Sequence, residues 1–419
     1  FKQKTAYEIP KRDWSSDVCS SDLALAEGRS DDFRRHWLGT HFFNPPRYLH
    51  LLEVIPTADT DPKGVETVQQ FADHHLGKGV VIAKDSPNFI GNHIALHGLL
   101  PILRKVARGD YTIEEVDAMT GPALGRPKSA TFRTLDLAGV DILAHVVRNL
   151  HERLPDPDAR AAFVLPRFVA AMIDRKLVGE KSGAGFYKRA TTASGSEILT
   201  LDIDTLEYRP RRSARFPSIE AAASIADLDT RLRALYRGTD RVGEFLRATL
   251  EPTLRYTATV APVIADSSDD IDRVMRWGFG WERGPFELMR TLELPGARTS
   301  DLPPAENDYQ ALATARQSHC VIKSNAGASL VDLGDGVVCV EFHSKLNTLG
   351  ADALQMIQAG LEEASAHHQA LVVGCDAEHF SAGANLMLVL LEAQDENWDE
   401  LDLMVRTFQR TTIDRKSTR

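Results

Sequence analysis

Short apolar runs alternate with amphipathic stretches at the start of the chain. Residues 37–40 and 51–55 have the apolar content of strands, whereas 63–76 has the spacing of a helix with one apolar face. A further apolar run at 79–83 ends at a Lys-Asp-Ser-Pro turn, as expected of a buried strand. The order strand, loop, strand, helix, strand predicts the closing half of a nucleotide-binding α/β domain.

Residues 88–189 are predicted to be mostly helical. Apolar residues recur at near-helical spacing from Asn88 to Arg108, and Thr112-Ile-Glu-Glu115 is a capping-box pattern that opens another helix. A helix, a Gly-rich turn and an apolar helix then recur in the same order later in the chain, which predicts a duplicated helical unit. The two copies comprise 113–117, Gly121-Pro122 and 131–136 in the first, and 270–275, 277–281 and 284–288 in the second.

Two stretches are predicted to connect these units. Residues 190–216 shift to Thr, Ser, Arg and Pro, and 291–320 contain three prolines and few apolar clusters. A new α/β unit is predicted after the second connector. It spans 321–413, with strands at 337–342 and 370–374 and a helix at 351–365.

Composition narrows the class of protein. Hydrophobic residues make up 43% of the chain and charged residues 26%, which suits buried cores. The formal net charge of −10 makes nucleic acid and anionic membranes poor candidates as partners. Four scattered cysteines without a CxxC argue against a disulfide framework or a zinc site. No apolar run of about 18 residues occurs, so no membrane span is predicted.

Both ends of the chain resemble translated sequencing-adapter DNA. Residues 2–9 and 12–23 match one strand of such an adapter, and 414–419 match the opposite strand. We therefore expect 1–23 and 414–419 to be foreign to the protein, and about 24–413 to be an internal fragment of a longer one. The alternative is a natural disordered tail. If residues 1–23 are foreign, the lack of a leader sequence in them carries no information about the protein.

The segment Gly39-Thr-His41-Phe-Phe-Asn44-Pro45-Pro46 carries the clearest chemistry. His41 is a candidate general base, because a neutral imidazole takes up a proton near neutral pH. Glu53 follows twelve residues later, and a carboxylate on the other ring nitrogen fixes the tautomer and stabilises the imidazolium. Asn44 is an amide that can hold a substrate oxygen.

This segment resembles the active-site motif of 3-hydroxyacyl-CoA dehydrogenases. The resemblance continues at Ser86-Pro-Asn-Phe-Ile-Gly-Asn92, where the second domain begins. It implies that His41 is the base and that Glu53 orients it. Asn44 and Asn92 match two family asparagines near the substrate. The implied reaction converts (3S)-3-hydroxyacyl-CoA to 3-ketoacyl-CoA with NAD as cofactor.

The dinucleotide fingerprint of that family does not occur in the 419 residues. No G-x-G-x-x-G is present, although such a loop normally cradles the pyrophosphate at a helix N-terminus. A family serine that precedes the histidine segment also has no match. We therefore expect the chain as printed to bind NAD poorly or not at all, and to be catalytically silent.

The last unit resembles the start of an enoyl-CoA hydratase, or crotonase, domain. The resemblance rests on Val337 to Asn347 and on His379-Phe-Ser-Ala-Gly-Ala-Asn-Leu386. It implies that Ala384 provides a backbone N–H for the thioester oxyanion. The alternative is an ordinary strand-to-helix turn. The catalytic carboxylates of that family come later, so hydratase chemistry is not expected from these residues.

The resemblances together imply a bacterial bifunctional fatty-acid oxidation protein that acts on acyl-CoA thioesters in the cytoplasm, as a homo-oligomer or in complex with a thiolase. A non-catalytic acyl-CoA-binding or assembly module on the same fold is the alternative. The expected fold class is α/β followed by mostly α. The expected parts are a partial Rossmann-type NAD-binding domain (24–85), two 6-phosphogluconate-dehydrogenase-like helical domains (86–189 and 217–290), linkers (190–216 and 291–320) and a partial crotonase-like domain (321–413).

Overall fold

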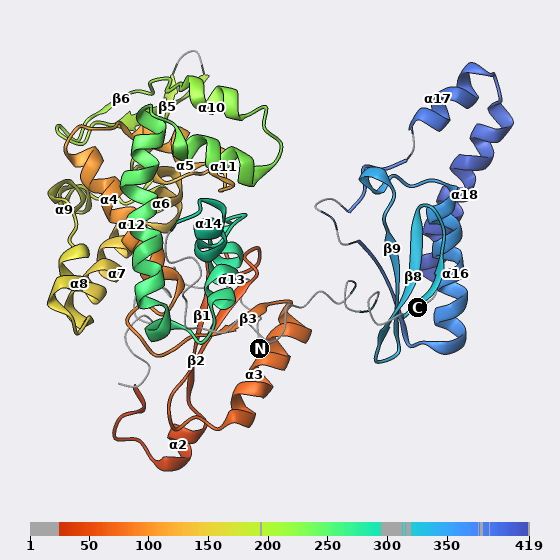
Figure 1. Cartoon of the computed structure of the whole chain (residues 1–419), viewed down its shortest axis with the longest axis horizontal. Helices are drawn as coiled ribbons and strands as arrows, with labels where there is room; N and C mark the ends of the chain where they lie inside the picture. The colour runs from red at the N-terminus through yellow and green to blue at the C-terminus, as the bar shows by residue number, and fades with distance from the viewer. Residues whose placement is uncertain are drawn as a thin grey trace. The chain divides into compact units, whose positions relative to one another are not determined.

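The computed structural model describes residues 25–192, 195–294 and 320–417, apart from residues 376, 378, 379 and 385, together with the single residues 312 and 315. Side chains beyond residue 411 lie outside this description. The chain divides into two units, residues 1–305 and 306–419 (Figure 1). The predictions for residues 1–23 fall outside the described residues.

The first unit contains two small sheets and a helical body (Figure 1). Its strands are β1 (Leu38–Phe42), β2 (Leu51–Pro56), β3 (Gly79–Ile82), β4 (Tyr187–Thr192), β5 (Gly195–Leu201) and β6 (Tyr208–Pro210). Its helices are α2 (Asp31–Arg35), α3 (Pro62–Leu76), α4 (Gly91–Ala107), α5 (Ile113–Thr120), α6 (Phe132–Ala138), α7 (Val140–Arg153), α8 (Pro157–Ala162), α9 (Arg167–Asp174), α10 (Pro217–Ala222), α11 (Leu228–Arg237), α12 (Arg241–Ile264), α13 (Ser268–Phe279) and α14 (Pro285–Thr291).

The first sheet has the order β1-β2-β3 and follows the predicted sequence of elements. β1 and β2 are antiparallel, and β2 and β3 are parallel, with α3 as the crossover between them. The central strand β2 is buried from Leu51 to Ile55 on both faces. Leu52 and Val54 pack toward α3, whereas Leu51 and Ile55 belong to the core shared with the helical body. This double burial explains why the residues of β2 on either side of Glu53 are apolar on both faces of the sheet.

Helix α4 links this sheet to the helical body and packs against α12. A buried aromatic cluster lies between the two helices. His93 accepts from the hydroxyl of Tyr256 at 2.6 Å and donates to the Pro87 carbonyl, which can only accept. The ring of His97 stacks on Tyr256 at 3.8 Å. Burial lowers the pKa of both histidines to about 4, so they are neutral at neutral pH.

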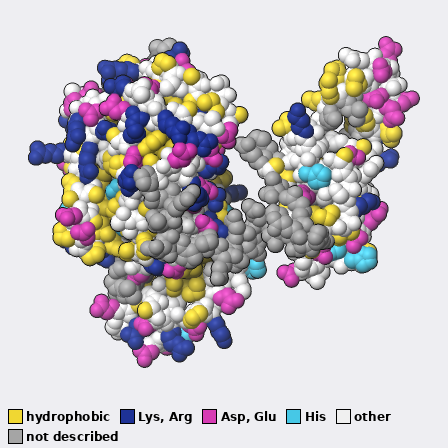
Figure 2. All heavy atoms as spheres, in the orientation of Figure 1, with side chains coloured by type: hydrophobic (Ala, Val, Ile, Leu, Met, Phe, Trp, Pro, Cys, Tyr) yellow, Lys and Arg dark blue, Asp and Glu magenta, His cyan; other side chains and the backbone are white. Residues whose placement is uncertain are grey.

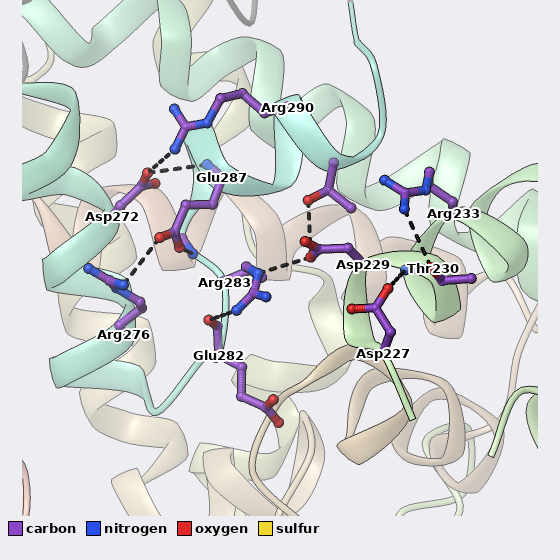
Figure 3. Close-up of polar contacts among 12 residues, drawn as sticks. Asp227, Asp229, Thr230, Arg233, Asp272, Arg276, Glu282, Arg283, Glu287 and Arg290 are labelled. Atoms are coloured by element: carbon purple, nitrogen blue, oxygen red, sulfur yellow. Dashed lines mark hydrogen bonds and ion pairs between the residues drawn. The ribbon is translucent and has the colours of Figure 1, made fainter. Parts of the chain in front are cut away.

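The two predicted helical copies contain the same hydrogen-bonding device. Asp117 in α5 accepts from the backbone N–H of Phe132, at the start of α6. Asp272 in α13 accepts from the N–H of Phe286, at the start of α14, and also lies beside Arg290 (Figure 3). Burial raises the pKa of Asp117 to about 6 and that of Asp272 to about 7. In each copy, an aspartate of the first helix therefore caps the second helix.

The Gly-rich turns of the two copies meet each other. The N–H of Glu282 donates to the carbonyl of Gly125 at 2.8 Å. Gly125 has a φ of +65°, and a Cβ there would lie 2.7 Å from a methyl carbon of Leu228. The guanidinium of Arg126 lies 3.9 Å above the ring of Trp281, within the range of a cation–π contact. These contacts join the two helical copies within one unit.

Ion pairs on the second copy fix α14 to its neighbours (Figure 3). Arg283 donates to Asp229 of α11 at 2.9 Å, and Arg276 of α13 pairs with Glu287 at 3.1 Å. Glu287 also accepts from the backbone N–H of Gly284, which completes a capping arrangement at the start of α14. Charged side chains of α11 and α13 thus hold the start of α14 in place.

The segment predicted as a connector at 190–216 contains regular structure. β4, β5 and β6 form a three-stranded antiparallel sheet. Some of its Thr, Ser and Arg residues lie in these strands, as Thr191, Ser196 and Arg209 do, whereas others, such as Arg211 and Arg212, follow β6. A composition typical of a linker therefore does not exclude a small sheet. Glu114 of α5 anchors this sheet, because Arg209 of β6 donates to both of its carboxylate oxygens, at 2.6 and 3.0 Å.

The second unit is an α/β layer. It comprises β7 (Val321–Ser324), β8 (Ala328–Gly334), β9 (Val337–Phe342), β10 (Ala370–Gly374), α16 (Ala351–His367), α17 (Leu386–Gln394) and α18 (Trp398–Ser417). The sheet order is β10-β9-β8-β7, with β10 parallel to β9 and the other pairs antiparallel. α16 covers one face through Ala353, Met356 and Ile357. The predicted strands and helix of this unit are observed at nearly the same positions.

Helix α17 exposes most of its apolar side chains, as the yellow spheres over it in Figure 2 show. Leu386, Met387, Leu390 and Leu391 are each more than half exposed. α18 continues through Ser417, past the predicted boundary at residue 413. Within the described parts of both units, no helix is long and apolar enough to cross a membrane, and no three His, Cys, Asp or Glu side chains gather as metal ligands.

The Glu114–Arg209 pair gives a pH-dependent prediction. Burial acts to raise the pKa of Glu114, but hydrogen bonds from Arg209 and the Arg212 amide lower it, and the result is about 2 against an ordinary 4.5. A lowered carboxylate pKa stabilises the fold above the unfolded pKa, and this contribution is lost as the pH falls toward 2. We expect Glu114→Gln to lower the free energy of unfolding at pH 7 by on the order of 2 kcal/mol.

The measurement is urea unfolding of both proteins from pH 7 down to the lowest pH at which they stay folded. The difference in the free energy of unfolding between the wild type and Glu114→Gln should become smaller below about pH 4.5. Glu197→Gln, on an exposed position of β5, is the matched control and should leave stability unchanged at every pH. If this difference in the free energy of unfolding stayed the same at every pH, the assigned role of the Glu114 carboxylate would be contradicted.

Candidate active site

The register of β1 and β2 places His41 directly opposite Glu53. Opposed residues of an antiparallel pair point to the same face of the sheet, so a spacing of twelve residues brings the two side chains together. Nδ1 of His41 lies 2.6 Å from Oε2 of Glu53. The imidazole is 14% exposed, and the carboxylate is fully buried. The predicted pairing of His41 with Glu53 is therefore present in the structure.

The second carboxylate oxygen of Glu53 is held by the start of α4. Oε1 accepts from the N–H of Gly91 at 2.9 Å and from that of Ile90 at 3.2 Å. α4 has no capping side chain of its own at this end, so Glu53 satisfies N–H groups that the helix leaves unpaired. A negative charge at a helix N-terminus is also favoured by the helix dipole. Three donors thus fix both carboxylate oxygens.

This arrangement sets the tautomer of His41. An ionised carboxylate only accepts, so the proton on Nδ1 is donated to Glu53. Nε2 then carries the lone pair and is the proton acceptor of the ring. The paired carboxylate stabilises the imidazolium that forms when Nε2 takes up a proton. The pair has the geometry of a general base with its orienting group.

The ring of Phe43 fixes the surroundings of His41. Their ring centres lie 4.6 Å apart, and Phe43 also contacts Phe279 at the end of α13. A Cβ on Gly91 would lie 2.8 Å from the Phe43 ring, and one on Gly278 would lie 2.7 Å from Leu51. Both glycines are therefore required for the close approach of α4 and α13 to the strand behind the histidine.

The two predicted substrate asparagines flank this pair. Asn44 is exposed and lies three residues after His41, at a cis peptide bond to Pro45. Asn92 lies in the first turn of α4, directly after Gly91, and is half-buried. Both are adjacent in sequence to groups of the His41–Glu53 site. Their roles toward a substrate stay predictions.

Ala384 lies in the second unit, away in sequence from this site. It is exposed and forms an isolated parallel bridge with Leu349, after a Gly383 with a φ of +90°. His379 and Asn385 of the same motif lie outside the described residues. The role of Ala384 as an oxyanion donor stays a prediction.

Asn88 has a structural role that the sequence analysis did not identify. Its side chain is fully buried, and its backbone adopts a φ of +62°. Nδ2 donates to the carbonyl of Val146, and Oδ1 accepts from Asn149. The only available signal was an asparagine between Pro87 and Phe89, since asparagine tolerates the left-handed conformation better than most residues.

Comparison with known families shows which proteins this chain is similar to. Residues 16–86 match the NAD-binding domain of 3-hydroxyacyl-CoA dehydrogenase, and residues 89–189 match its C-terminal domain. These two segments belong to the 3-hydroxyacyl-CoA dehydrogenase family. The first match begins within residues 1–23, which lie outside the described residues, so their predicted foreign origin stays a prediction.

Curated relatives are similar to this chain over different lengths. A probable 3-hydroxyacyl-CoA dehydrogenase of Bacillus subtilis is 42% identical over 93% of this chain and 54% of its own length. One of Deinococcus radiodurans is 50% identical over 39% of this chain and 46% of its length. A putative fatty acid oxidation complex trifunctional enzyme of Rickettsia felis is 27% identical over 93% of this chain and 55% of its own length. The chain spans about half the length of these relatives.

NAD is the cofactor of the matched dehydrogenase domain. The described residues include the hydrogen-bonded pair of His41 and Glu53. No G-x-G-x-x-G occurs in the 419 residues, so the residues present do not provide that cradle for a pyrophosphate.

The contacts of Glu53 predict a stability effect that needs no substrate. Glu53→Ala leaves the N–H groups of Ile90 and Gly91 and the Nδ1 proton of His41 without an acceptor. Each buried donor left unpaired costs about 1–3 kcal/mol. We expect the free energy of unfolding to fall by about 3–5 kcal/mol, measured by urea denaturation. His41→Ala should cost clearly less, because Glu53 keeps two donors; equal losses would contradict this account.

Proposed function

We propose that His41 is the general base of an NAD-dependent (3S)-3-hydroxyacyl-CoA dehydrogenase and that Glu53 orients it. The observation that carries the proposal is the 2.6 Å contact of Nδ1 with a fully buried carboxylate, itself fixed by the start of α4. A merely structural histidine would not need one ring nitrogen to be bound so firmly while the other is left as an acceptor. Family membership supports the same assignment.

The residues of the chain perform the proton part of the reaction. Nε2 of His41 takes the proton of the substrate hydroxyl as that carbon is oxidised, and Glu53 stabilises the imidazolium. In the reverse direction the imidazolium returns the proton to the keto oxygen. Asn44 and Asn92 hold the substrate oxygens beside the base in this proposal. The substrate is an acyl-CoA thioester, and bound NAD would supply the hydride acceptor.

The second unit supports a role in fatty-acid oxidation. We propose that residues 321–413 form the start of a crotonase-like domain, in which the N–H of Ala384 is an oxyanion donor. The parallel bridge of Ala384 to Leu349, ten residues after the end of β10, supports this reading of the turn. A relative named as a trifunctional enzyme of a fatty acid oxidation complex matches the chain through the same region. Assembly with a thiolase and a cytoplasmic location follow from the resemblance and are part of the proposal.

The decisive test is His41→Gln in a protein that carries these residues together with a G-x-G-x-x-G loop. Glutamine keeps polarity but cannot take up the proton, so we expect kcat to fall by about 10²–10⁴-fold. Acyl-CoA binding should persist, because only the proton transfer is lost. The assay is acetoacetyl-CoA reduction followed by NADH absorbance. His151→Gln, on the exposed face of α7, is the matched control, and near-normal kcat in His41→Gln would refute the proposal.

A second expectation concerns the 419 residues as printed. Without the glycine-rich loop, the nicotinamide is not held within reacting distance of the substrate, and positioning of this kind supplies several kcal/mol (about 7–11) of catalysis. We expect no saturable NADH binding at micromolar concentrations in a fluorescence titration, and no turnover of acetoacetyl-CoA. Saturable binding, or turnover that His41→Gln abolishes, would show that these residues hold NAD by another route.

A further inference from the structure

Hydrogen bonds to α7 hold the loop that precedes α4. Asn88 is fully buried, and its side chain is held at both ends: Nδ2 donates to the Val146 carbonyl at 2.8 Å, and Oδ1 accepts from Asn149 at 2.9 Å. Val146 and Asn149 lie one turn apart on α7. Because both ends of this buried amide are hydrogen-bonded to α7, the loop is held in one position relative to that helix.

The backbone of this loop adopts a conformation that needs support. Asn88 and Phe89 have φ values of +62° and +53°, and non-glycine residues pay about 1 kcal/mol or more for this region. The two residues turn the chain so that the N–H groups of Ile90 and Gly91 point at Glu53. The side-chain contacts of Asn88 therefore support the conformation that aims both amides.

The contacts form a continuous path to the histidine. It begins with the hydrogen bond from Asn149 to Asn88 and continues along the backbone to the amides of Ile90 and Gly91. These amides donate to Oε1 of Glu53, and Oε2 of the same carboxylate binds Nδ1 of His41. Every step is a hydrogen bond or a covalent neighbour. Phe89 adds a packing contact, since its ring centre lies 5.7 Å from that of His41.

We propose that Asn88, held by Asn149 of α7, is a positioning residue for His41. It acts through the two amides and Glu53, and it touches neither the imidazole nor a substrate. The inference rests on the proposed function of His41 as the base. It assigns α7 a part in setting the geometry of the proton acceptor. If Asn88 only stabilised the fold, its loss would lower stability but leave the His41–Glu53 contact unchanged in the folded protein.

The test uses the Nδ1 proton of His41 in the 419-residue chain. A proton in a short, charge-assisted hydrogen bond resonates far downfield, and its loss in His41→Gln assigns it. In Asn88→Gly, which retains the positive φ, we expect this signal to move upfield or broaden. The amide protons of Ile90 and Gly91 should exchange with solvent at least about tenfold faster. Asn149→Ala should produce the same changes from the far end of the path.

Lys176→Gly is the matched control, because it also replaces a residue with a φ near +60°, at the end of α9 and outside this path. It should leave the downfield proton unchanged. The double variant Asn88→Gly/Asn149→Ala should perturb the signal no more than the stronger single variant, since both remove one shared contact. An unchanged proton and unchanged exchange in both Asn88→Gly and Asn149→Ala would overturn the proposal, even if both variants lose stability.

The proton measurement separates this inference from the proposed function, because it needs neither NAD nor turnover. If Asn88→Gly displaces the proton but His41→Gln retains normal kcat in the dehydrogenase assay, the positioning path stands and the assignment of the base fails. If His41→Gln abolishes turnover and the proton is unaffected by Asn88→Gly, the base stands and the positioning role fails.

Discussion

The buried carboxylate of Glu53 is the interaction on which the site depends. It joins the middle of a sheet to the first turn of a helix, and it binds an imidazole at the same time. A buried charge is tolerated only where donors compensate for the lost water, and here three N–H groups do so. The surroundings of the pair are closely packed, because a Cβ on Gly91 would lie 2.8 Å from the Phe43 ring and one on Gly278 would lie 2.7 Å from Leu51.

Local patterns predicted much of this arrangement. The apolar run of β2, the capping box at Thr112 and the twelve-residue spacing of His41 and Glu53 all concern residues close in sequence, and the structure confirms each of them. The role of Asn88 was not predictable in this way, because its partners on α7 lie about sixty residues later. The sheet at 187–210 was missed for a different reason. Its Thr, Ser and Arg content is typical of a connector, and its anchor to Glu114 is a tertiary contact.

The two predicted helical copies use one hydrogen-bonding device. The predicted repeat rested on the order of a helix, a Gly-rich turn and a second helix. In both segments an aspartate of the first helix, Asp117 or Asp272, accepts from the backbone N–H of a phenylalanine at the start of the second. Each aspartate thereby satisfies an N–H group that the second helix leaves unpaired at its start.

The meeting of the two Gly-rich turns has a consequence for how this protein can change during evolution. The carbonyl of Gly125 is bound by the N–H of Glu282, and Gly280 approaches the ring of Pro127. A Cβ on Gly125 would meet the side chains of Leu228 and Glu282, and one on Gly280 would meet the ring of Pro127. Substitutions in one turn are therefore expected to be energetically coupled to substitutions in the other, as for residues in contact.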